Sequence, residues 1–352
     1  MKNTKDLYAH GGNIYEIRQR YGNNILDFSA NINPLGIPLQ IKKLLNKKID
    51  VLSHYPDAQA HRLKAALSRY WNVKEENVLV GNGSTELIYL ILNALQPACV
   101  TIPVPSFTEY ERAARIAKSR VQFIRLLVSE GFCLKTDQIK NCDALFLCNP
   151  NNPTGNLLMH NRQNIEKLPA KRIIMDESFM DFLSDEKAHT LIGRATQSKK
   201  IIVFRTFTKF FGLAGLRIGY AIAHRHTVQF LRRFQMPWSV NALAQAAAEC
   251  MLSEKGYIQR SRQAIEKERV FLYDAISHIK GLKPYPSVAN FLLIEIKNGR
   301  LTSTHLKERL LKRGILIRDC ANFRGLNNKF IRIAVRSRRE NLKLIRALKE
   351  AT

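Results

Sequence analysis

One lysine of the sequence, Lys209, stands among residues that would make its amine reactive. It lies in the segment spanning residues 205–220, among aromatic and small residues and beside two threonine hydroxyls. Apolar surroundings lower the pKa of a lysine and favour the neutral amine that attacks an aldehyde. Arg217, in the same segment, adds a guanidinium that could hold a phosphate together with the hydroxyls. This context favours a chemical role over that of a solvated surface lysine.

Three other segments place polar groups directly after apolar runs. Residues 81–86 combine two glycines with a serine and a threonine at the expected start of a helix, where free N–H groups attract phosphate. Residues 149–155 form a loop with two prolines that fix the backbone and three polar asparagines. Asp176 and Glu177 add two carboxylates. Taken alone, these three segments could be a helix cap, a turn and a surface acid pair, respectively. The prediction therefore rests on their occurring together.

Together the four segments supply what pyridoxal phosphate requires of a protein. These requirements are a lysine that condenses with the aldehyde, an acid that keeps the ring nitrogen protonated, and an anchored phosphate. We therefore predict pyridoxal 5'-phosphate as the cofactor. No metal site is predicted, because the six cysteines form neither a C-x-x-C pair nor a Cys/His cluster. Scattered cysteines are typical of reduced thiols, which predicts a cytoplasmic protein.

The elements that must position these groups can be predicted from periodicity. Short apolar runs predict seven strands, at residues 77–80, 99–104, 121–126, 144–148, 172–175, 200–204 and 218–223. Helical spacing separates several of them, as in residues 84–95 and 108–119. This alternation predicts an α/β fold with a mainly parallel seven-stranded sheet sandwiched by helices. Ligands of such sheets bind beyond the carboxyl ends of the strands, where the polar segments stand.

The pattern changes after about residue 235 and predicts a smaller C-terminal α+β domain. Its expected elements are a long helical region, a strand, a helix, two further strands and a closing helix, at residues 241–279, 290–296, 304–312, 314–318, 330–335 and from 340. We expect an N-terminal arm over residues 1–40, associated with the small domain and the active site. The large cofactor-binding domain is expected over 41–240 and the small domain over 241–352.

The chain has 56 Lys and Arg against 29 Asp and Glu, a net charge of +27. Such a charge indicates either a nucleic-acid or anionic-membrane partner, or a basic surface on a protein that handles small anions. The positive residues are spread along the chain and no nucleic-acid motif accompanies them. No apolar run is long enough to span a membrane, and residues 1–13 lack the apolar core of a secretory signal. We predict a small anionic substrate, with no specific nucleic-acid partner and no membrane partner.

The segment around Lys209, Thr-Phe-Thr-Lys at 206–209 followed by Leu-Arg-Ile-Gly at 216–219, resembles the lysine signature of fold-type I aminotransferases. The Asn-Asn-Pro-Thr-Gly run at 151–155 and the Asp-Glu pair at 176–177 stand in the expected order and spacing. The resemblance covers nearly the whole chain. It implies a fold-type I pyridoxal-phosphate-dependent transferase fold and a homodimer with shared active sites.

Within this class the sequence resembles two groups, histidinol-phosphate aminotransferases and the threonine-phosphate decarboxylases of cobalamin biosynthesis. It is more similar to the decarboxylases at residues 10–14, 27–36, 235–244 and 315–323. Aminotransferases usually carry a tyrosine three residues after the ring-nitrogen aspartate, where this chain has Phe179. The resemblance implies decarboxylation of L-threonine O-3-phosphate to (R)-1-aminopropan-2-ol O-2-phosphate and CO2. Transamination of histidinol phosphate or a related amine is the alternative, because residue chemistry alone leaves the reaction type open.

The resemblance also implies roles for single residues. Lys209 binds the cofactor's aldehyde and later handles protons, and Asp176 pairs with the ring nitrogen. Asn152 bonds the ring oxygen and Phe107 stacks on the ring. The residues implied to hold the cofactor phosphate are Ser84, Thr85, Thr206, Thr208 and Arg217, together with Tyr55 reaching across from the neighbouring subunit.

Five residues are candidates for the substrate. Arg332 matches the arginine that binds the substrate α-carboxylate in this class, and a planar guanidinium suits a carboxylate. His10, Asn31, Arg318 and Arg336 are candidates for the substrate's own phosphate. Which arginine meets which anion stays open at this point.

Overall fold

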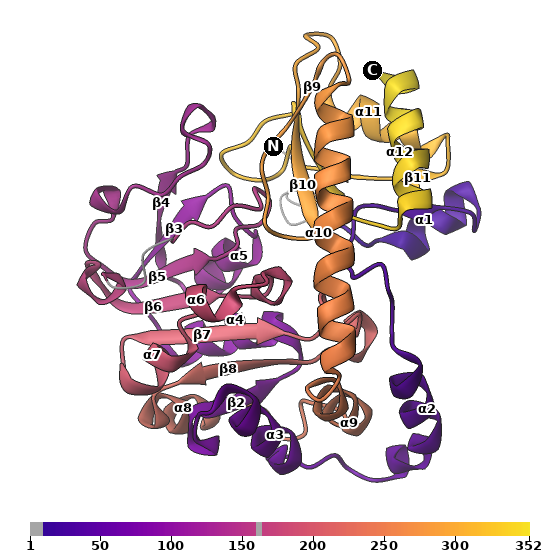
Figure 1. Ribbon diagram of the computed structural model, residues 1–352. Coiled ribbons are helices and arrows are strands. Elements are labelled where there is room, and N and C mark those ends of the chain that lie inside the picture. The colour runs from indigo at the N-terminus through magenta and orange to yellow at the C-terminus, as the bar shows by residue number, and fades with distance from the viewer. Residues whose placement is uncertain (1–9, 160–163) are drawn as a thin grey trace.

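The computed structural model describes residues 10–159 and 164–352, so the first nine residues of the expected arm lie outside the described residues. Its largest sheet confirms the predicted mainly parallel seven-stranded sheet (Figure 1). The strand order is β2-β8-β7-β6-β5-β3-β4, and β8 runs antiparallel to the other six strands. The strands are β2 Val78–Gly81, β3 Cys99–Val104, β4 Arg120–Arg125, β5 Cys142–Cys148, β6 Ala170–Asp176, β7 Ile201–Thr206 and β8 Gly219–Ala223.

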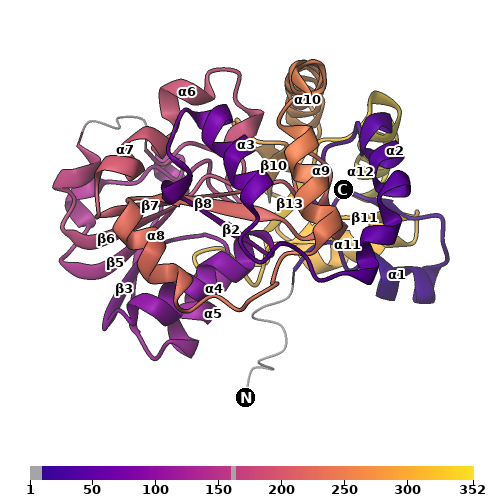
Figure 2. The ribbon, with the colours of Figure 1, turned by 90° about the horizontal axis from the view of Figure 1, so that it is seen from below.

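Helices cover both faces of this sheet, as Figure 2 shows. On one face, α4 (Gly83–Leu95), α5 (Glu109–Ile116) and α8 (Arg225–Arg232) bury residues such as Phe146 and Ile174. On the other face lie α3 (His61–Trp71), α7 (Ile192–Gln197) and α9 (Ala242–Met251). Successive residues of a strand point to opposite faces, so central strands buried on both sides read as unbroken apolar runs. That is why periodicity located these strands.

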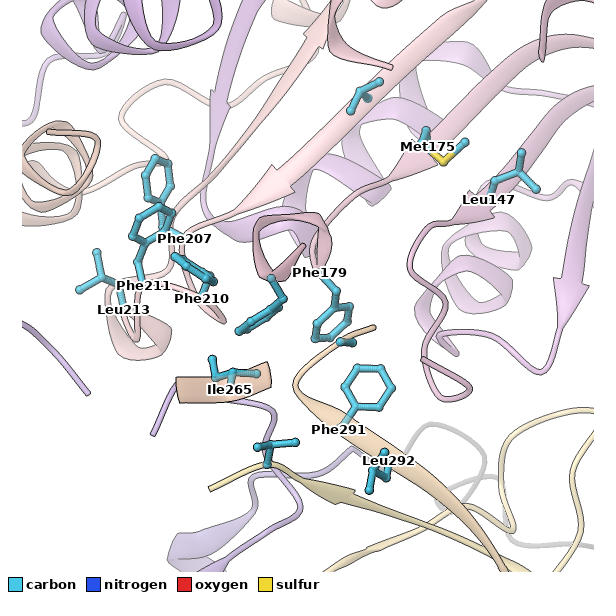
Figure 3. Close-up of a cluster of buried hydrophobic side chains, with 14 of the residues drawn as sticks. Leu147, Met175, Phe179, Phe207, Phe210, Phe211, Leu213, Ile265, Phe291 and Leu292 are labelled. Carbon is cyan, nitrogen blue, oxygen red and sulfur yellow. The ribbon is translucent and has the colours of Figure 1, made fainter. Parts of the chain in front are cut away.

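The C-terminal part contains a second, antiparallel sheet with the order β12-β13-β10-β9. Its strands are β9 Leu282–Pro284, β10 Phe291–Ile296, β12 Arg318–Asp319 and β13 Phe330–Ala334. Its helices are α10 Lys255–Ser277, α11 Ser303–Leu311 and α12 Arg338–Ala351. A single apolar core runs from Leu147 and Met175 of the large sheet through Phe210 to Ile265 of α10 and Phe291 of β10 (Figure 3). The two sheets therefore share a core across their junction.

The region expected to be one helical stretch over 241–279 is instead two helices, α9 and α10. The break falls at Leu252–Glu254, where the Ser253 hydroxyl donates to the carbonyl of Cys250 at 2.7 Å. A serine that bonds a nearby carbonyl competes with helix propagation. Among the described residues, no helix combines the length and apolarity needed to cross a bilayer.

The chain before residue 60 is tied to the C-terminal part. Strand β1 (Leu26–Asp27) pairs in parallel with β11 (Ile315–Leu316), and α1 (Ile14–Tyr21) packs Ile17 against Leu316. The helix α1 was not among the predicted elements. Helix α2 (Leu39–Lys47) and a short 3-10 turn (Ile49–Ser53) then lead the chain to α3.

Candidate active site

A cavity of about 420 Å³ opens at the carboxyl ends of the parallel strands, where they face the C-terminal sheet. Its volume falls in the usual range of small-molecule sites, roughly 300–1,000 Å³. Most of the predicted site residues line it: His10, Asn31, Ser84, Thr85, Phe107, Asn152, Asp176, Thr208, Lys209, Arg217, Arg318 and Arg332. Three of the predicted residues do not line it: Tyr55, Thr206 and Arg336.

One end of the cavity is a cradle at the N-terminus of α4. Gly83 has φ +78°, and a Cβ built there would lie 2.7 Å from Nη2 of Arg217, so the guanidinium occupies the space that a side chain would fill. Ser84 and Thr85 follow in the first turn, where backbone N–H groups have no helical acceptor. These groups and Arg217 form a site that suits a phosphate.

Thr206 supports this cradle from behind. Its side chain is buried, and its Oγ1 lies 2.9 Å from Oγ1 of Thr208, the threonine that lines the cavity. The resemblance implied direct phosphate contact for both threonines. Thr206 is the last residue of β7 and its Oγ1 also donates to the carbonyl of Ile218 at 3.2 Å, whereas Thr208 lies beyond the strand end and lines the cavity.

Asp176 ends β6 at the floor of the cavity and is 4% exposed. Its Oδ1 accepts the backbone N–H of Ser178 at 2.8 Å, and its Oδ2 accepts the hydroxyl of Tyr110. Burial raises the pKa of this carboxyl above its usual value, while the bonds from Ser178 and Tyr110 and the charge of Lys209 oppose that rise. Tyr110 is fully buried and stacks on Phe146, with ring centroids 4.8 Å apart.

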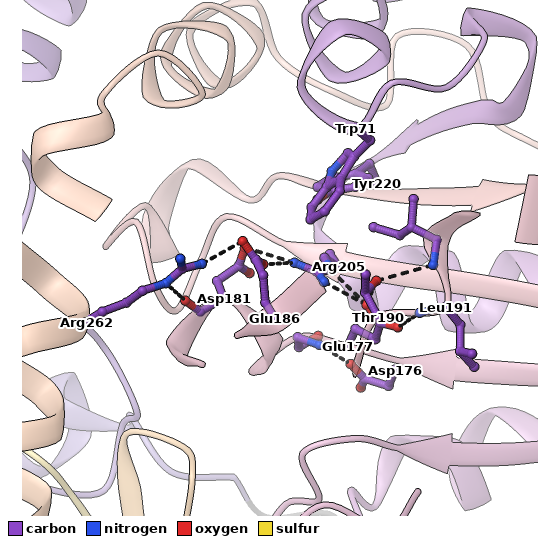
Figure 4. A network of polar contacts seen from close by, with 12 residues as sticks. Trp71, Asp176, Glu177, Asp181, Glu186, Thr190, Leu191, Arg205, Tyr220 and Arg262 are labelled. Carbon is purple, nitrogen blue, oxygen red and sulfur yellow. Dashed lines mark hydrogen bonds and ion pairs between the residues drawn. The ribbon is translucent and has the colours of Figure 1, made fainter. Parts of the chain in front are cut away.

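Glu177, the next residue, turns away from the cavity, because successive side chains of an extended segment alternate. Its carboxylate bonds the fully buried Arg205 at 2.8 Å. Arg205 also bonds Asp181 and Glu186, and Arg262 of α10 joins the same cluster (Figure 4). The two adjacent acids therefore belong to different parts of the molecule, one to the cavity and one to this buried ionic network.

Lys209 reaches the cavity between the cradle and the C-terminal sheet. Burial, together with the nearby cations Arg332 and Arg217, lowers the pKa of its amine to about 8, while Asp176 opposes this shift. Its backbone carbonyl accepts the N–H of Asn33 at 3.0 Å. A pKa near 8 leaves a sizeable neutral fraction at neutral pH, as a lysine nucleophile needs.

Two arginines stand side by side in the opposite wall. Arg318 and Arg332 are directly paired across β12 and β13. Arg332 donates through Nη1 to Oδ1 of Asn152 and through Nη2 to the carbonyl of Ser29 at 3.0 Å. Arg318 donates to Oδ1 of Asn322 at 2.7 Å. This wall can bind a ligand that carries two anionic groups.

Arg336 and Tyr55 lie elsewhere. The Arg336 guanidinium pairs with Glu340 at 2.9 Å and donates to the carbonyl of Asp27 at 3.2 Å, so it braces the start of α12 instead of facing the cavity. The assignment of Arg336 to the substrate phosphate is therefore not supported by its position in this chain. Tyr55 is 82% exposed and its ring packs on Trp238, with centroids 4.9 Å apart.

Several residues that line the cavity were not predicted, namely Gly11, Ser29, Ala30, Glu109, Arg112, Cys148, Ser178 and Phe323. Phe179, noted in the sequence as a departure from the class, also lines the cavity. Its ring packs edge-on against that of Phe291, with centroids 5.0 Å apart. Among the described residues, no group of His, Cys, Asp and Glu side chains could hold a metal ion.

Comparison with known proteins shows a family match over most of the chain. Residues 23–348 match the aminotransferase class I and II family. The chain belongs to this family. It is 37% identical over 356 residues to the threonine-phosphate decarboxylase of Salmonella typhimurium, covering 97% of this chain and 96% of that protein.

Two solved structures are similar to this chain over most of its length. The L-threonine-O-3-phosphate decarboxylase of Porphyromonas gingivalis has a TM-score of 0.81 at 29% identity, covering 92% of this chain and 98% of that one. The histidinol-phosphate aminotransferase of Clostridium acetobutylicum has a TM-score of 0.86 at 33% identity, covering 93% and 98%. Backbone similarity thus extends to members with two different reactions.

Proposed function

We propose that this family member is a pyridoxal-phosphate-dependent decarboxylase of L-threonine O-3-phosphate. The products would be (R)-1-aminopropan-2-ol O-2-phosphate and CO2, for cobalamin biosynthesis. The observation that carries the proposal is the 37% identity to a threonine-phosphate decarboxylase along almost the whole chain. The unpaired thiols of all six cysteines fit a cytoplasmic location.

The donor set of the cavity fits pyridoxal phosphate. The cradle of Ser84, Thr85, Thr208 and Arg217 suits its phosphate, and Gly83 leaves the space in which the guanidinium lies. Asp176, at the floor, suits the ring nitrogen. When bound, this cofactor supplies an aldehyde that condenses with amines and a ring that withdraws the electron pair left at the substrate's α-carbon.

The protein's own part in the reaction is to bind, orient and move a proton. Arg318 and Arg332 provide two guanidinium groups for the two anionic groups of the substrate, its carboxylate and its phosphate. The bond between the α-carbon and the carboxylate carbon breaks, and its electron pair stays with the α-carbon. Lys209, whose amine has a pKa of about 8, delivers a proton to that carbon, so each turnover releases CO2 and consumes one proton.

Transamination of histidinol phosphate is the second candidate, favoured by the TM-score of 0.86 to a histidinol-phosphate aminotransferase. The two reactions differ in which bond at the α-carbon breaks. Phe179 supports decarboxylation, because it lines the cavity without the hydroxyl that aminotransferases usually carry at this position.

Incubation of the purified protein with threonine phosphate, without any oxo acid, separates the candidates. We expect many turnovers with release of CO2. Activity that requires 2-oxoglutarate and yields glutamate would replace the proposal by transamination. The Lys209→Ala variant should lose turnover and the yellow colour of the bound cofactor while keeping the circular dichroism of the wild type. Full activity in that variant would contradict the lysine assignment.

We further propose that two copies of the chain associate through a surface around Tyr55 and Trp238. Near these two rings, Leu52, Phe234 and Met236 are also exposed, with Met236 at 73%. An apolar patch of this kind is typical of an interaction site. Tyr55 contacts no part of the cavity in its own subunit, which agrees with a role at the cavity of a second copy.

Light scattering after gel filtration tests this association. We expect the mass of a dimer for the wild type and a shift towards monomer with weaker cofactor binding for Tyr55→Ala. Tyr15 is equally exposed, at 82%, and lies on α1, so Tyr15→Ala is the matched control. A wild-type protein that elutes as a monomer at all concentrations would exclude the proposed interface.

A further inference from the structure

The wall of the anion-binding cavity contains a carboxylate whose presence needs an explanation. Glu109 lines the cavity, is 3% exposed and lies in the first turn of α5. Arg112, Arg318 and Arg332 line the same cavity, as expected for an anionic substrate. An uncompensated carboxylate there would repel the substrate.

Both oxygens of Glu109 are engaged by the protein. Oε1 lies 2.7 Å from Nε2 of His10 and 3.6 Å from Nη1 of Arg112, and Oε2 accepts the hydroxyl of Tyr89. Burial alone would raise the pKa of this carboxyl, but the hydrogen bonds from His10 and Tyr89 and the charges of His10 and Arg112 bring it below its usual value. Glu109 is thus a buried anion with three partners on different segments.

The partner that matters for the substrate is His10. It belongs to the N-terminal arm, lines the cavity and lies against Phe107, with ring centroids 5.5 Å apart. Two-fifths of its side chain is exposed, at 43%, and the only polar contact described for its ring is the one to Glu109. Because Nε2 faces a carboxylate, it carries a hydrogen, and this bond fixes which edge of the ring faces Glu109.

We propose that Glu109 is a positioning residue for the phosphate of the substrate. By accepting the Nε2 hydrogen of His10, it ties the arm to α5 at the cavity mouth and turns the Nδ1 edge of the ring, as an N–H donor, towards the substrate phosphate. This inference rests on the proposed function in so far as the substrate is phosphorylated. His10 in turn shields the substrate phosphate from the negative charge of Glu109. Loss of either residue alone should therefore weaken binding of that phosphate.

The arrangement predicts a distinctive result in a double-mutant cycle. Glu109→Gln should raise KM for threonine phosphate about tenfold with little change in kcat, the usual size for loss of a hydrogen bond to a charged group. His10→Ala should raise KM more, because it also leaves the carboxylate facing the phosphate. Adding Glu109→Gln to His10→Ala should then lower KM again, since the repelling charge is removed.

Glu111 provides the matched control. It lies on the same helix and is similarly buried, and Arg115 and Arg324 each bond its carboxylate at 2.9 Å, yet it does not line the cavity. Glu111→Gln should leave KM unchanged. Inhibition by L-threonine, which lacks the phosphate, should be the same in Glu109→Gln and wild type, as should the affinity for the cofactor.

The outcomes separate this inference from the proposed function. A wild-type enzyme that transaminates histidinol phosphate and releases no CO2 would overturn the proposed function, and the same KM cycle would then be measured on histidinol phosphate. A KM change below about twofold in Glu109→Gln, or a second substitution that worsens His10→Ala, would overturn the positioning role. Equal weakening of L-threonine and threonine phosphate would also overturn it, because it would indicate general damage to the site.

Discussion

Replacement of Arg205 by methionine would test how far the buried ionic network stabilises the fold. The guanidinium of Arg205 makes four hydrogen bonds of 2.8–3.2 Å, to Glu177, Asp181 and Glu186. It also lies over the ring of Trp71, 4.4 Å from the centroid. Methionine retains much of the length and apolar volume of this side chain but removes the charge.

The expected loss follows from what remains after the substitution. The three carboxylates are all at most 7% exposed and, among the described residues, would keep Arg262 as the remaining cation of the network. Breaking a buried ion pair by removing one partner costs about 3–5 kcal/mol. Because domains are stable by only about 5–15 kcal/mol, this variant should unfold at a markedly lower urea concentration than the wild type.

The loss of unfolding free energy caused by Arg205→Met should also depend on pH. Burial raises the pKa of Asp181 to about 6 even with Arg205 present, although Arg205 opposes the rise. A carboxyl whose pKa is higher in the folded than in the unfolded state lowers the free energy of unfolding at pH values above the folded-state pKa. It has no such effect below its unfolded-state pKa, near 4. Removing the arginine raises the folded-state pKa values further, so the difference from wild type should shrink between about pH 8 and about pH 5.

Urea unfolding followed by circular dichroism at both pH values measures these differences. Arg62 is the control, because its side chain is 75% exposed and pairs with Glu249 at 3.0 Å. An exposed pair contributes about 0–1 kcal/mol, so Arg62→Met should unfold almost like wild type. The network would not have the proposed stabilising role if Arg205→Met were as stable as the control. The same would follow if its loss of unfolding free energy were equal at both pH values.

Three further predictions concern the cofactor site. Tyr110→Phe removes the hydroxyl that bonds Asp176 and should weaken cofactor affinity and kcat about tenfold each, measured by titration of the apoprotein and by initial rates; unchanged values would exclude this role of Tyr110. Gly83→Ala puts a Cβ 2.7 Å from Nη2 of Arg217 at φ +78° and should weaken cofactor binding about tenfold, since such strain costs roughly 1–3 kcal/mol; wild-type affinity would contradict the cradle. The rate of cofactor attachment to Lys209, followed by absorbance, should rise with pH and level off above about 8, because the neutral amine reacts; a rate independent of pH would argue against this pKa.

The sequence predicted the parts of the site that are local in the chain. The seven strands of the large sheet were located to within two residues, because buried strands form unbroken apolar runs. Asp176 ends β6, Lys209 and Asn152 lie in the loops that follow β7 and β5, and parallel strands bring their carboxyl ends to one edge. Their meeting in one cavity was therefore predictable without knowledge of any long-range contact.

The remaining parts depend on contacts between distant residues. The pairing of His10 with Glu109 spans 99 positions, and Tyr110 approaches Asp176 across 66, so no local pattern announces either. Arg336 was a reasonable candidate by its spacing from Arg332, but the strand ends before it and the chain turns into α12. In each case the deciding information is three-dimensional.

The parallel pairing of β1 with β11 joins the N-terminal arm to the C-terminal part, and residues of both line the cavity. Leu26 and Asp27 pair with β11, the backbone N–H of Ala334 donates to the carbonyl of Phe28, and Arg332 donates to the carbonyl of Ser29, so this stretch of the arm is fixed to the C-terminal part. The arm and the C-terminal sheet thus form one side of the cavity and the strand ends of the large sheet form the other, above a shared apolar core. A substitution that shifted β1 along β11 would carry the Ser29 carbonyl with it and so move the guanidinium of Arg332 relative to Lys209.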